Sequence, residues 1–447
     1  MSLKITVIGT GYLGATHAAA MAELGFEVLG LDVVPEKIEM LRRGEVPMYE
    51  PGLEELLSKH VEGVEGSSGR LRFTMDWAEL ADFGDIHFVC VNTPQKHGEY
   101  ACDMSYVDAA VASLAPHLKH SALVVGKSTV PVGSADRLAA YLAEHAPAGE
   151  GAELAWNPEF LREGFAVRDT LHPDRIVVGV RSERAEKLLR EVYATPVAEG
   201  TPFVVTDFPT AELVKASANS FLATKISFIN AMAEVCEAAG GDVAKLAEAI
   251  GYDDRIGKKF LRAGIGFGGG CLPKDIRAFM ARAGELGADQ ALTFLREIDS
   301  INMRRRGQMV EMAREALGGG SFLGKRVAVL GATFKPDSDD VRDSPALNVA
   351  GQIHLQGGQV TVYDPKGMDN ARRIFPTLGY ADSALDGVRG ADVVLHLTEW
   401  REFRELDPAG LGEAVTSRVV LDGRNALDPE LWRQAGWTYR AMGRPTA

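Results

Sequence analysis

The chain has 447 residues, of which 46% are hydrophobic and 25% are charged, so we expect a globular protein of two or three domains. Its formal net charge of −14 argues against nucleic-acid binding, which requires a basic surface. No apolar run reaches the length of a membrane span, and the N-terminal residues lead directly into a strand, so we expect neither a membrane partner nor a signal peptide. The four cysteines lack metal-ligand spacing, which predicts a reduced, cytoplasmic protein without a metal site.

A dinucleotide-binding pattern occupies the start of the chain. Residues 4–8 form a predicted buried strand, which runs into the sequence GTGYLG at residues 9–14 and then into an alanine-rich helix to about Leu24. A second predicted strand, residues 26–31, ends at Asp32. A strand, a glycine turn, a helix and an acidic residue in this order are typical of a Rossmann domain that binds NAD.

The residues of this pattern have distinct roles. Gly9 makes the tight turn, Gly11 lets the backbone approach the pyrophosphate, and Gly14 lets the helix pack against the strand. The carboxylate of Asp32 would bind ribose hydroxyls and repel a 2′-phosphate, so the sequence predicts NAD rather than NADP. Lys37 either faces the same cofactor or is a surface lysine.

Polar residues also follow two later strands. Residues 85–91 and 122–128 are predicted strands, and Thr93 and Thr129 come just after them. Polar side chains at the carboxyl ends of parallel strands face the ligand crevice of an open α/β sheet. The two threonines are therefore candidates for lining the nicotinamide side of the cofactor, with turn capping as the alternative.

The segment NPEFLREG, residues 157–164, predicts a loop that enters a helix. Glu159 and Glu163 are four residues apart, so on a helical turn they would share one face. That face either contacts a ligand or is a solvated acidic surface. The chain then returns as a predicted strand over residues 175–179.

Residues 209–239 have helical periodicity throughout. Lys215 and Asn219 lie four residues apart, so both can reach one ligand, and an asparagine inside a helix suggests a polar role. A surface lysine with an incidental asparagine is the alternative. A helix of this length often bridges domains or forms a dimer core, and its predicted apolar face carries Leu213, Phe221, Phe228 and Met232.

The segment FLRAGIGFGGGCLPKD, residues 260–275, is the strongest candidate for chemistry. Its glycines bring backbone N–H groups close to a ligand, and Pro273 suits the first turn of a helix, so Cys271 is expected at a helix N-terminus. The helix dipole and Lys274 would lower the pKa of this thiol, whose thiolate is the nucleophile. A buried cysteine in a glycine turn is the alternative, but Lys274 and Asp275 favour a catalytic residue.

A second long helix is predicted at about residues 289–317, and its Arg304–Arg306 run predicts a solvated face. From Lys325 the alternation of strands and helices restarts. The first turn of this repeat lacks GxGxxG and carries Lys335 instead. We therefore predict an α/β protein with two doubly wound Rossmann-like domains, residues 1–200 and 319–447, joined by a long central helix and a helical core in residues 201–318.

Taken together, these motifs resemble the UDP-glucose/GDP-mannose dehydrogenase family over nearly the whole chain. The motifs that carry the resemblance are GTGYLG, STVPVG, NPEFLREG, KASANSFLATKISFINA, GFGGGCLPKD, GATFKPDSDDVRDSP and LDGRNAL, in the order of that family. The ATKISFIN and GFGGGCLPKD segments are most similar to members that act on UDP-glucose. Two positions depart from the family pattern: Ala231 follows Asn230 where an acidic residue is usual, and the middle one of the three glycines before Cys271 stands where relatives often have serine.

The resemblance implies a four-electron oxidation of the C6 alcohol of UDP-glucose to a carboxylate, through an aldehyde, with two NAD+. An aldehyde gives up no hydride until a nucleophile adds to it, and Cys271 would add to form first a thiohemiacetal and then a thioester. By the same resemblance, Lys215 and Asn219 lie near the reacting oxygen and Asp275 acts as a base. Glu159 is implied in thioester hydrolysis, and Thr129 in holding the catalytic water.

The resemblance also implies which residues bind the ligands. The NAD contacts are Gly9, Gly11, Tyr12, Leu13, Gly14, Asp32, Lys37, Thr93, Thr129, Glu163, Lys274 and Arg342. The substrate contacts are Glu159, Phe160, Leu161, Arg162, Glu163, Lys215, Asn219, Phe260, Leu261, Arg262, Ala263, Gly264, Gly268, Phe334, Lys335 and Arg424. Arg255 corresponds to an arginine that the neighbouring subunit of a homodimer supplies, and the dimer is expected to form through the central helix.

Three alternatives stay open at this point. In the first, the substrate is a different nucleotide sugar, either GDP-mannose or a UDP-N-acetylhexosamine. In the second, the protein is a two-electron dehydrogenase of the hydroxyacid or 6-phosphogluconate kind, which would not need Cys271. In the third, the protein is a nucleotide-sugar sensor that binds its ligand without producing NADH, and the set of Lys215, Asn219, Cys271 and Asp275 argues against this alternative.

Overall fold

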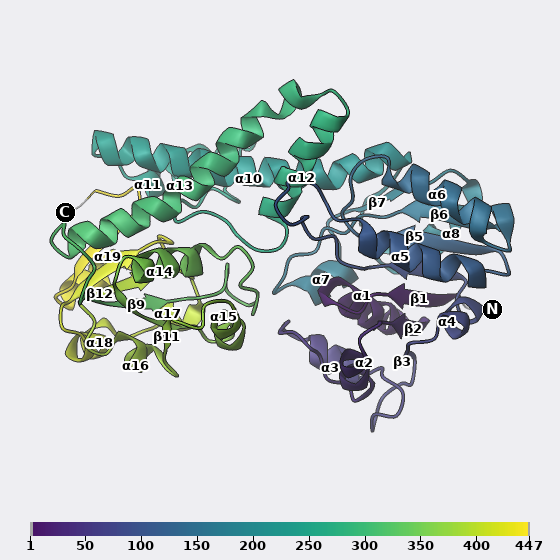
Figure 1. The fold of residues 1–447 in the computed structure, drawn as a ribbon, viewed down its shortest axis with the longest axis horizontal. Coiled ribbons are helices and arrows are strands. Elements are labelled where there is room, and N and C mark those ends of the chain that lie inside the picture. Colours follow the sequence, from purple (N-terminus) through teal and green to yellow (C-terminus); the bar gives the residue numbers. More distant parts are fainter. Residues whose placement is uncertain (1–2, 446–447) are drawn as a thin grey trace. The chain divides into compact units, whose positions relative to one another are not determined.

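The computed structural model of the protein describes residues 3–445. They form two compact units: the first comprises the chain up to residue 218 together with 277–285, and the second comprises 219–276 and the chain from 286 onward. Each unit is built on its own β-sheet, with helices on both faces (Figure 1). The predicted α/β architecture of two Rossmann-like sheets and long connecting helices is confirmed, whereas the domain boundaries at residues 200 and 318 stay predictions.

The first unit contains eight strands, which are β1 (Lys4–Ile8), β2 (Glu27–Leu31), β3 (Leu71–Thr74), β4 (Ile86–Val89), β5 (Ala122–Gly126), β6 (Ala152–Trp156), β7 (Ile176–Gly179) and β8 (Phe203–Thr206). They form one sheet in the order β3-β2-β1-β4-β5-β6-β7-β8. The first six strands are parallel, and β7 pairs antiparallel with β6. This order places the topological switch point, where dinucleotides bind, between β1 and β4.

The strands of this sheet form because their residues are apolar and mostly β-branched, which suits strands that are covered on both faces. In β1, with the sequence KITVI, the last four residues are buried, and all five residues of β5 are buried. Ile5 of β1 pairs with Val28 of β2 on one side and with Ile86 of β4 on the other. The sequence predictions for β1, β2, β4, β5 and β7 are confirmed to within two residues at each end.

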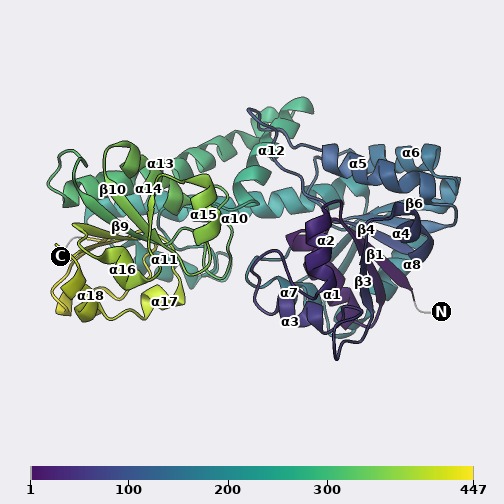
Figure 2. The same ribbon diagram turned by 60° about the horizontal axis from the view of Figure 1, so that its bottom comes forward.

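Helices cover both faces of the first sheet, and each face has its own hydrophobic core. Ile5 and Val7 face one core, whereas Ile8 and Leu31 face the other. Figure 2 shows α5 and α6 along one face of the sheet. The helical elements of the unit are α1 (Tyr12–Glu23), α2 (Pro35–Arg42), α3 (Leu53–Ser58), α4 (Trp77–Phe83), α5 (Ser105–Leu114), η1 (Ala115–His117), α6 (Ser134–His145), η2 (Gly149–Gly151), α7 (Ala166–Leu171), α8 (Glu183–Val192) and α9 (Ala194–Ala198).

Two long helices each belong to both units. The first is α10 (Phe208–Ala239), a helix of 32 residues whose limits match the prediction. It starts there because Asp207 Oδ1 accepts a hydrogen bond from Thr210 N at 2.7 Å, and it ends where Gly240 takes a positive φ of 74°. The second is α12 (Leu272–Glu285), which begins directly after Cys271, as the position of Pro273 predicts.

The second unit contains a six-stranded, wholly parallel sheet with the order β11-β10-β9-β12-β13-β14, which repeats the doubly wound order of the first sheet. Its strands are β9 (Arg326–Leu330), β10 (Gln359–Tyr363), β11 (Gly379–Tyr380), β12 (Val393–His396), β13 (Val419–Asp422) and β14 (Thr438–Ala441). Its helical elements are α11 (Val243–Gly251), η3 (Asp289–Leu292), α13 (Thr293–Ala316), α14 (Pro345–Leu355), α15 (Met368–Ile374), α16 (Ala384–Val388), α17 (Arg401–Arg404), α18 (Pro408–Ala414) and α19 (Pro429–Gln434).

The segment from Asn157 to Gly164 differs from its prediction, because the chain becomes helical only at Ala166. Glu159 and Glu163 therefore do not share the face of a helical turn. The loop is held by its own polar side chains: Glu159 Oε2 accepts a hydrogen bond from Leu161 N at 2.6 Å, which competes with helical hydrogen bonding. Glu159 and Glu163 thus occupy different positions along an irregular loop.

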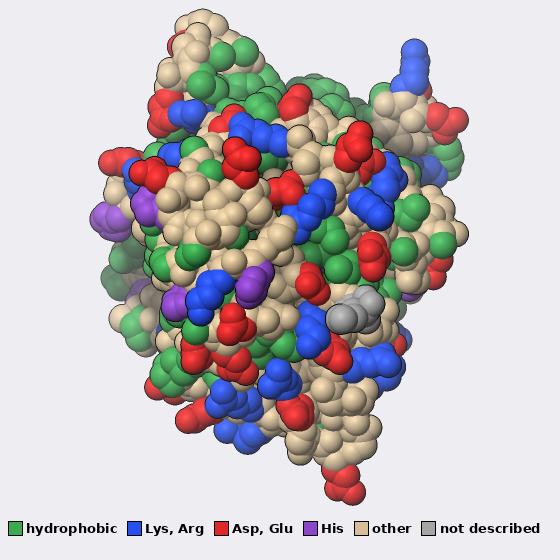
Figure 3. Space-filling model, turned by 90° about the vertical axis from the view of Figure 1, so that its right-hand side faces the viewer, with side chains coloured by type: hydrophobic (Ala, Val, Ile, Leu, Met, Phe, Trp, Pro, Cys, Tyr) green, Lys and Arg blue, Asp and Glu red, His purple; other side chains and the backbone are tan. Residues whose placement is uncertain are grey.

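The helices and the surface charges of the molecule both concern its contact with solvent or membrane. Within residues 3–445, no helix is both long enough and apolar enough to cross a membrane. On the face drawn in Figure 3, acidic and basic side chains are interspersed over the surface.

Candidate active site

The dinucleotide turn of the first unit depends on its glycines. A Cβ atom at Gly14 would lie 1.7 Å from the carbonyl oxygen of Gly9, so only glycine lets α1 approach β1 this closely. Gly9 has a φ of +85°, and a Cβ there would lie 2.8 Å from Val91 Cγ1. At Gly11 the nearest atom to an added Cβ would be Asn92 Oδ1 at 3.9 Å, so this backbone is open to a ligand. The predicted roles of the three glycines therefore match their geometry.

The N-terminus of α1 fits a pyrophosphate. Gly11 is its N-cap residue and has no side chain to accept hydrogen bonds from the first N–H groups of the helix. These N–H groups and the positive end of the helix dipole are the groups that bind phosphate in dinucleotide-binding folds. The following Tyr12 uses its hydroxyl oxygen to accept a hydrogen bond from Gly164 N at 2.9 Å. This part of the chain therefore fits the diphosphate of NAD.

Asp32 lies at the end of β2, as predicted, and is 6% exposed. Its Oδ2 accepts hydrogen bonds from Thr10 N at 2.9 Å and from Lys37 Nζ at 2.9 Å. Burial raises the pKa of Asp32, but the hydrogen bonds from Lys37 and Thr10 outweigh burial and hold this pKa below its usual value. The ionised carboxylate fits ribose hydroxyls and disfavours a 2′-phosphate, and the predicted Lys37 lies in the same cluster.

The remaining NAD candidates divide between the two units. Thr93 follows β4 and is 6% exposed, and Thr129 follows β5 and is half-buried. Glu163 lies half-buried in the loop before α7, whereas Lys274 and Arg342 belong to the second unit. The first unit brings together one part of the predicted NAD site. This part consists of the glycine turn, the N-terminus of α1 and Asp32.

Lys215 and Glu159 form an ion pair within the first unit. Lys215 Nζ lies 3.0 Å from Glu159 Oε1, and the two side chains are 6% and 14% exposed. The ammonium is also 5.5 Å from the centroid of the Phe160 ring, which Arg175 covers at 3.8 Å. The predicted lysine and glutamate thus form one ion pair in a largely dry environment, where electrostatic interactions are strong.

In the second unit, a buried carboxylate lies one turn into α12 from Cys271. Asp275 is 2% exposed, and its Oδ2 accepts a hydrogen bond from Asn219 Nδ2 at 2.6 Å. Its Oδ1 lies 2.7 Å from Lys274 Nζ. Cys271 is exposed, and its carbonyl oxygen accepts the helical hydrogen bond of Asp275 N at 2.9 Å. The structure therefore brings together three of the predicted catalytic residues, Asn219, Cys271 and Asp275, whose catalytic roles stay predictions.

The glycines before Cys271 let the chain pack closely against the rest of the second unit. A Cβ at Gly268 would lie 2.2 Å from the carbonyl oxygen of Asp343, and a Cβ at Gly264 would lie 2.4 Å from that of Gly423. Gly266 has a φ of +90°, which disfavours any other residue. The predicted substrate segment is therefore a buried, irregular chain whose shape is set by close backbone contacts.

Phe260, at the start of this segment, has a positive φ of 65° although it is not glycine. An aromatic residue in the left-handed region is strained by about 1–3 kcal/mol, and such strain clusters at binding and active sites. The side chain of Phe260 is 39% exposed. Its conformation is consistent with the predicted contact to the substrate.

The predicted solvated face at Arg304–Arg306 is wrong for two of its three residues. Arg304 is exposed, but Arg305 and Arg306 are 0% and 1% exposed. Their burial follows from the irregular chain, whose carbonyl oxygens have no strand or helix partners and need donors. Arg305 Nε donates to Gly264 O at 3.2 Å, and Arg306 Nη2 donates to Phe267 O at 3.1 Å.

Asn302, one turn earlier in α13, completes this support. Its Oδ1 accepts a hydrogen bond from Phe267 N at 2.7 Å, and its Nδ2 donates to Phe267 O at 3.0 Å. Arg306 Nη1 also pairs with Asp343 Oδ1 at 2.8 Å. We name Asn302, Arg305 and Arg306 the α13 support. Sequence analysis missed these residues as part of the site, although their spacing of three and four on one helix was a signal.

Arg424 has a similar position in the second unit. Its guanidinium donates to Leu397 O at 2.8 Å, to Gly266 O at 2.8 Å and to Phe334 O at 3.1 Å. Burial lowers the pKa of Arg424, and the nearby Glu399 opposes this shift. Its predicted contact with the nucleotide sugar stays a prediction, and the structure shows that Arg424 fixes the glycine-rich chain.

The other substrate candidates are placed as follows. Phe160, Leu161 and Arg162 lie in the irregular loop after β6, where Arg162 pairs with Asp169. Leu261 and Ala263 are buried, and Arg262 is exposed. In the second unit, Lys335 Nζ lies 5.7 Å from the Phe334 ring, Arg342 pairs with Asp340, and the exposed Arg255 pairs with Asp253.

One further residue connects α10 with the loop that carries Thr129. Glu212 is 3% exposed and accepts hydrogen bonds from Gly133 N and Ala135 N, both at 2.7 Å. It therefore caps the N-terminus of α6 from a distance of 77 residues or more in the sequence. Burial raises the pKa of Glu212, and the hydrogen bonds oppose this shift. Its position three residues before Lys215 was the one sequence signal for a role.

Comparisons with known proteins agree with this geometry. Family models match residues 3–197, 209–304 and 328–429, as the NAD binding, central and UDP binding domains of the UDP-glucose/GDP-mannose dehydrogenase family. The chain is 40% identical to a UDP-glucose 6-dehydrogenase of Rhizobium meliloti, over 99% of this chain and 100% of that protein. It is 37% identical to UDP-glucose 6-dehydrogenase YwqF of Bacillus subtilis, over 99% of this chain and 98% of that protein.

Solved structures are similar over the same length. A UDP-glucose dehydrogenase from Pyrobaculum islandicum is 36% identical with a TM-score of 0.90, over 99% of this chain and 98% of that chain. A UDP-D-ManNAc dehydrogenase from Pyrococcus horikoshii is 28% identical with a TM-score of 0.86, over the whole of both chains. The fold and the dinucleotide site define an NAD-dependent dehydrogenase. The chain belongs to the UDP-glucose/GDP-mannose dehydrogenase family.

The first prediction concerns Asp32. The Asp32→Asn substitution keeps the shape of the side chain but removes its charge, and weakening a hydrogen bond to a charged group costs about 1.5–3 kcal/mol. We expect the KM for NAD+ to rise about tenfold or more and the preference over NADP+ to shrink. Initial rates with both cofactors measure this. Asp76→Asn, at the exposed N-cap of α4, is the control, and an unchanged NAD+ preference in Asp32→Asn would contradict the assignment.

The second prediction concerns the α13 support. Arg306→Met removes the ion pair with Asp343 and one of the two donors to the carbonyl oxygen of Phe267, and losing a hydrogen bond to a charged group costs about 1.5–3 kcal/mol. The neighbouring Arg304→Met removes only an exposed pair with Glu234, which is worth about 0–1 kcal/mol. Denaturant unfolding should therefore show a large loss of stability for Arg306→Met and a small one for Arg304→Met. Equal losses of stability in the two variants would argue against a structural role for the α13 support.

Proposed function

We propose that this protein oxidises the C6 alcohol of UDP-glucose to the carboxylate of UDP-glucuronate, with two NAD+ per sugar. The observation that carries the proposal is the exposed Cys271 at the start of α12 with the buried carboxylate of Asp275 one turn away. A dehydrogenase that stops at a carbonyl needs no nucleophile, whereas one that forms an acid does. Full-length similarity to the UDP-glucose 6-dehydrogenases of Rhizobium meliloti and Bacillus subtilis supports UDP-glucose as the sugar.

Cys271 is the nucleophile of the proposed reaction. NAD+, when bound, supplies the hydride acceptor for both oxidations. The N-terminal end of the 14-residue helix α12 favours the thiolate form of the cysteine. The sulfur adds to the aldehyde carbon to give a thiohemiacetal, whose oxidation gives a thioester. Hydrolysis of the thioester breaks the carbon–sulfur bond, releases the acid and restores the thiol.

Asp275 is the proposed base. Its carboxylate is buried but is bound by the amide of Asn219 at 2.6 Å and by the ammonium of Lys274 at 2.7 Å. These two donors hold the carboxylate in one orientation. In the proposal Asp275 takes the proton of the C6 alcohol, directly or through a water molecule. Asn219 orients the carboxylate.

Lys215 and Glu159 serve the steps in which charge develops on oxygen. The ammonium of Lys215 stabilises the alkoxide and the oxyanion of the tetrahedral intermediates. Glu159, whose Oε1 lies 3.0 Å from Lys215 Nζ, takes a proton from the hydrolytic water. Thr129 holds that water with its hydroxyl group. Each of these roles is part of the proposal.

The nucleotide part of the substrate is assigned to the second unit. The backbone of the glycine-rich chain and the ammonium of Lys335 provide local positive potential for a diphosphate in an acidic protein. Phe260 to Gly264 and Gly268 belong to the same proposed site, together with Phe334 and Arg424. The part of the second unit that contains residues 328–429 matches the UDP binding domain of the family.

A second nucleotide sugar is the alternative substrate. The UDP-D-ManNAc dehydrogenase of Pyrococcus horikoshii has a similar fold, with a TM-score of 0.86 over the whole chain. Initial rates with UDP-glucose, GDP-mannose and a UDP-N-acetylhexosamine decide between them. We expect the highest kcat/KM for UDP-glucose. A higher value for either of the other sugars would replace the substrate but keep the chemistry.

A homodimer formed through α10 is also part of the proposal. Phe221, Phe228 and Val235 lie seven residues apart on this helix and are 67%, 46% and 58% exposed. Apolar residues at this spacing form one stripe, and a stripe of this kind favours pairing with a second helix. The exposed Arg255 is proposed to reach the substrate of the neighbouring subunit. A cytoplasmic location completes the proposal, because the cysteine spacing lacks any disulfide or metal pattern.

The third prediction tests the nucleophile. Wild-type protein should yield two NADH for each UDP-glucose consumed, as the four-electron oxidation requires. Cys271→Ala should form no UDP-glucuronate, because the aldehyde has no thiol to trap it. NADH absorbance and chromatography of the sugar nucleotide measure both quantities. Cys236→Ala, at a buried cysteine of α10, is the control, and undiminished acid formation by Cys271→Ala would refute the mechanism.

The fourth prediction tests the dimer. Replacing Phe221 and Phe228 with aspartate places charges on the apolar stripe, so association should become unfavourable. Sedimentation velocity should then show a species of half the wild-type mass, with the fold retained by circular dichroism. Leu355→Asp, at a leucine that is 86% exposed outside the stripe, should leave the mass unchanged. A wild-type monomer would rule out the dimer.

A further inference from the structure

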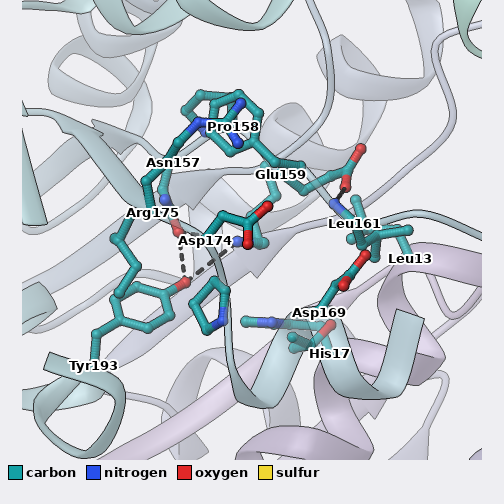
Figure 4. Close-up of a pocket in the computed structure, with 15 residues that line it drawn as sticks. Leu13, His17, Asn157, Pro158, Glu159, Leu161, Asp169, Asp174, Arg175 and Tyr193 are labelled. Carbon is teal, nitrogen blue, oxygen red and sulfur yellow. Dashed lines mark hydrogen bonds between the residues drawn. The ribbon is translucent and has the colours of Figure 1, made fainter. Parts of the chain in front are cut away.

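The first unit contains a pocket to which the proposed function assigns no role. Its cavity volume is about 50 Å3, and the dinucleotide helix α1, the loop after β6, α7 and β7 all contribute residues to it (Figure 4). Its floor is buried, whereas Asp174 at its rim is exposed. The pocket can therefore exchange its contents with solvent. One water requires on the order of 10–15 Å3 of such space, so the pocket has room for a few.

The floor of the pocket is a buried polar network. Lys127 Nζ donates to Asn157 Oδ1 at 2.9 Å and to the hydroxyl oxygen of Tyr193 at 3.2 Å. Tyr193 donates its own hydroxyl proton to Asn157 Oδ1 at 2.5 Å. Lys127 is 7% exposed and Tyr193 is 4% exposed. Because an ammonium has three N–H donors, Lys127 has one donor more than these two hydrogen bonds use.

His17 gives an independent sign of bound water. It is 1% exposed, lines the pocket and forms no hydrogen bond to the described residues through either ring nitrogen. Burial, and next to it the charge of Lys127, lowers the pKa of His17 well below its ordinary value, so the ring is neutral. A neutral imidazole has one donor and one acceptor, and buried groups of this kind are satisfied by protein or ordered water.

Glu159 connects this pocket with the proposed catalytic residues. Its side chain lines the pocket, and its Oε1 accepts a hydrogen bond from Lys215 Nζ at 3.0 Å. Its Oε2 accepts from Leu161 N at 2.6 Å, which holds the carboxylate in one orientation. Figure 4 shows the carboxylate of Glu159 beside Leu161 on the pocket wall. A water of the pocket can therefore reach a carboxylate that is already paired with the catalytic lysine.

We propose that this pocket is a water-binding site that supplies the hydrolytic step, with Glu159 as the group to which the water is passed. The inference rests on the proposed function, in which a thioester on Cys271 must be hydrolysed. The water oxygen bonds to the acyl carbon, the carbon–sulfur bond breaks, and the electron pair goes to the sulfur of Cys271. The proton of the water goes to Glu159, and no oxidant or reductant is consumed.

The test narrows the pocket without altering the proposed catalytic residues. Thr170 of α7 lines the pocket and donates only to Ala166 O within its helix, at 2.7 Å, so Thr170→Leu fills space and leaves the floor network intact. Arg168→Leu, at an exposed residue of the same helix, is the matched control. Tyr193→Phe is a second variant that removes one bond of Lys127 at nearly constant volume.

The expected result is a specific delay of hydrolysis. Thr170→Leu should release a rapid burst of two NADH per active site and then turn over about tenfold more slowly, which corresponds to an activation free energy that is higher by about 1.4 kcal/mol. Mass spectrometry of acid-quenched protein should show more acyl adduct on Cys271 than in the wild type. The KM values for NAD+ and UDP-glucose should change little. Tyr193→Phe should show the same signs at smaller amplitude.

The other outcomes separate the inference from the proposed function. If both pocket variants turn over like Arg168→Leu and carry no more adduct than the wild type, the pocket does not supply the water. If turnover falls but no adduct accumulates, the variants act on an earlier step, and the inference is overturned as well. If the wild-type protein itself produces no NADH from UDP-glucose, the proposed function fails before the pocket is in question.

Discussion

The second unit depends on how a buried, irregular chain satisfies its backbone polar groups. The segment from Gly264 to Gly270 belongs to neither a strand nor a helix and is almost wholly buried, so its N–H and C=O groups need partners from other parts of the chain. The α13 support and Arg424 provide these partners. Each unpaired buried group would cost about 1–3 kcal/mol, so these residues keep a chain with little structure of its own in one shape. The start of α12, and with it Cys271, follows from that shape.

The same logic explains how an acidic protein has cationic groups at its site. With a net charge of −14, the surface as a whole repels an anionic substrate. Three cations of the candidate site and its support are held by specific partners: Lys215 by Glu159, Lys274 by Asp275 and Arg306 by Asp343. In a buried environment of low dielectric constant, each of these charges interacts more strongly than it would at the surface. Local geometry, rather than net charge, therefore decides what the protein can bind.

The features that sequence predicts well are those set by neighbours in the chain. The turn at Gly9 to Gly14, the start of α12 after Cys271 and the limits of α10 all follow from local rules for glycine, proline and capping residues. The burial of Arg305 and Arg306 does not, because it depends on carbonyl groups about 40 residues away in the sequence. A run of three arginines has the same local pattern whether it faces solvent or an irregular chain.

The candidate site divides in the same way. Asn219 and Asp275 belong to one predicted catalytic set, and a hydrogen bond joins them across 56 residues of sequence. The network of Lys127, Asn157 and Tyr193 left no pattern in the sequence, because its members are 30 to 66 residues apart and each is ordinary in its own segment. The segment that contains Glu159 was predicted as a loop that enters a helix, but the helical turn expected at Glu159 is absent from the structure, and the role of Glu159 stays a prediction.

Phe260 shows that the sequence is not optimised for folding alone. A glycine would take its backbone conformation without strain, and replacing a strained residue in this way is an ordinary route to a more stable protein. The chain nevertheless has an aromatic ring at this position and leaves part of it exposed to solvent. A Phe260→Gly variant would therefore exchange an exposed aromatic ring for a backbone without strain.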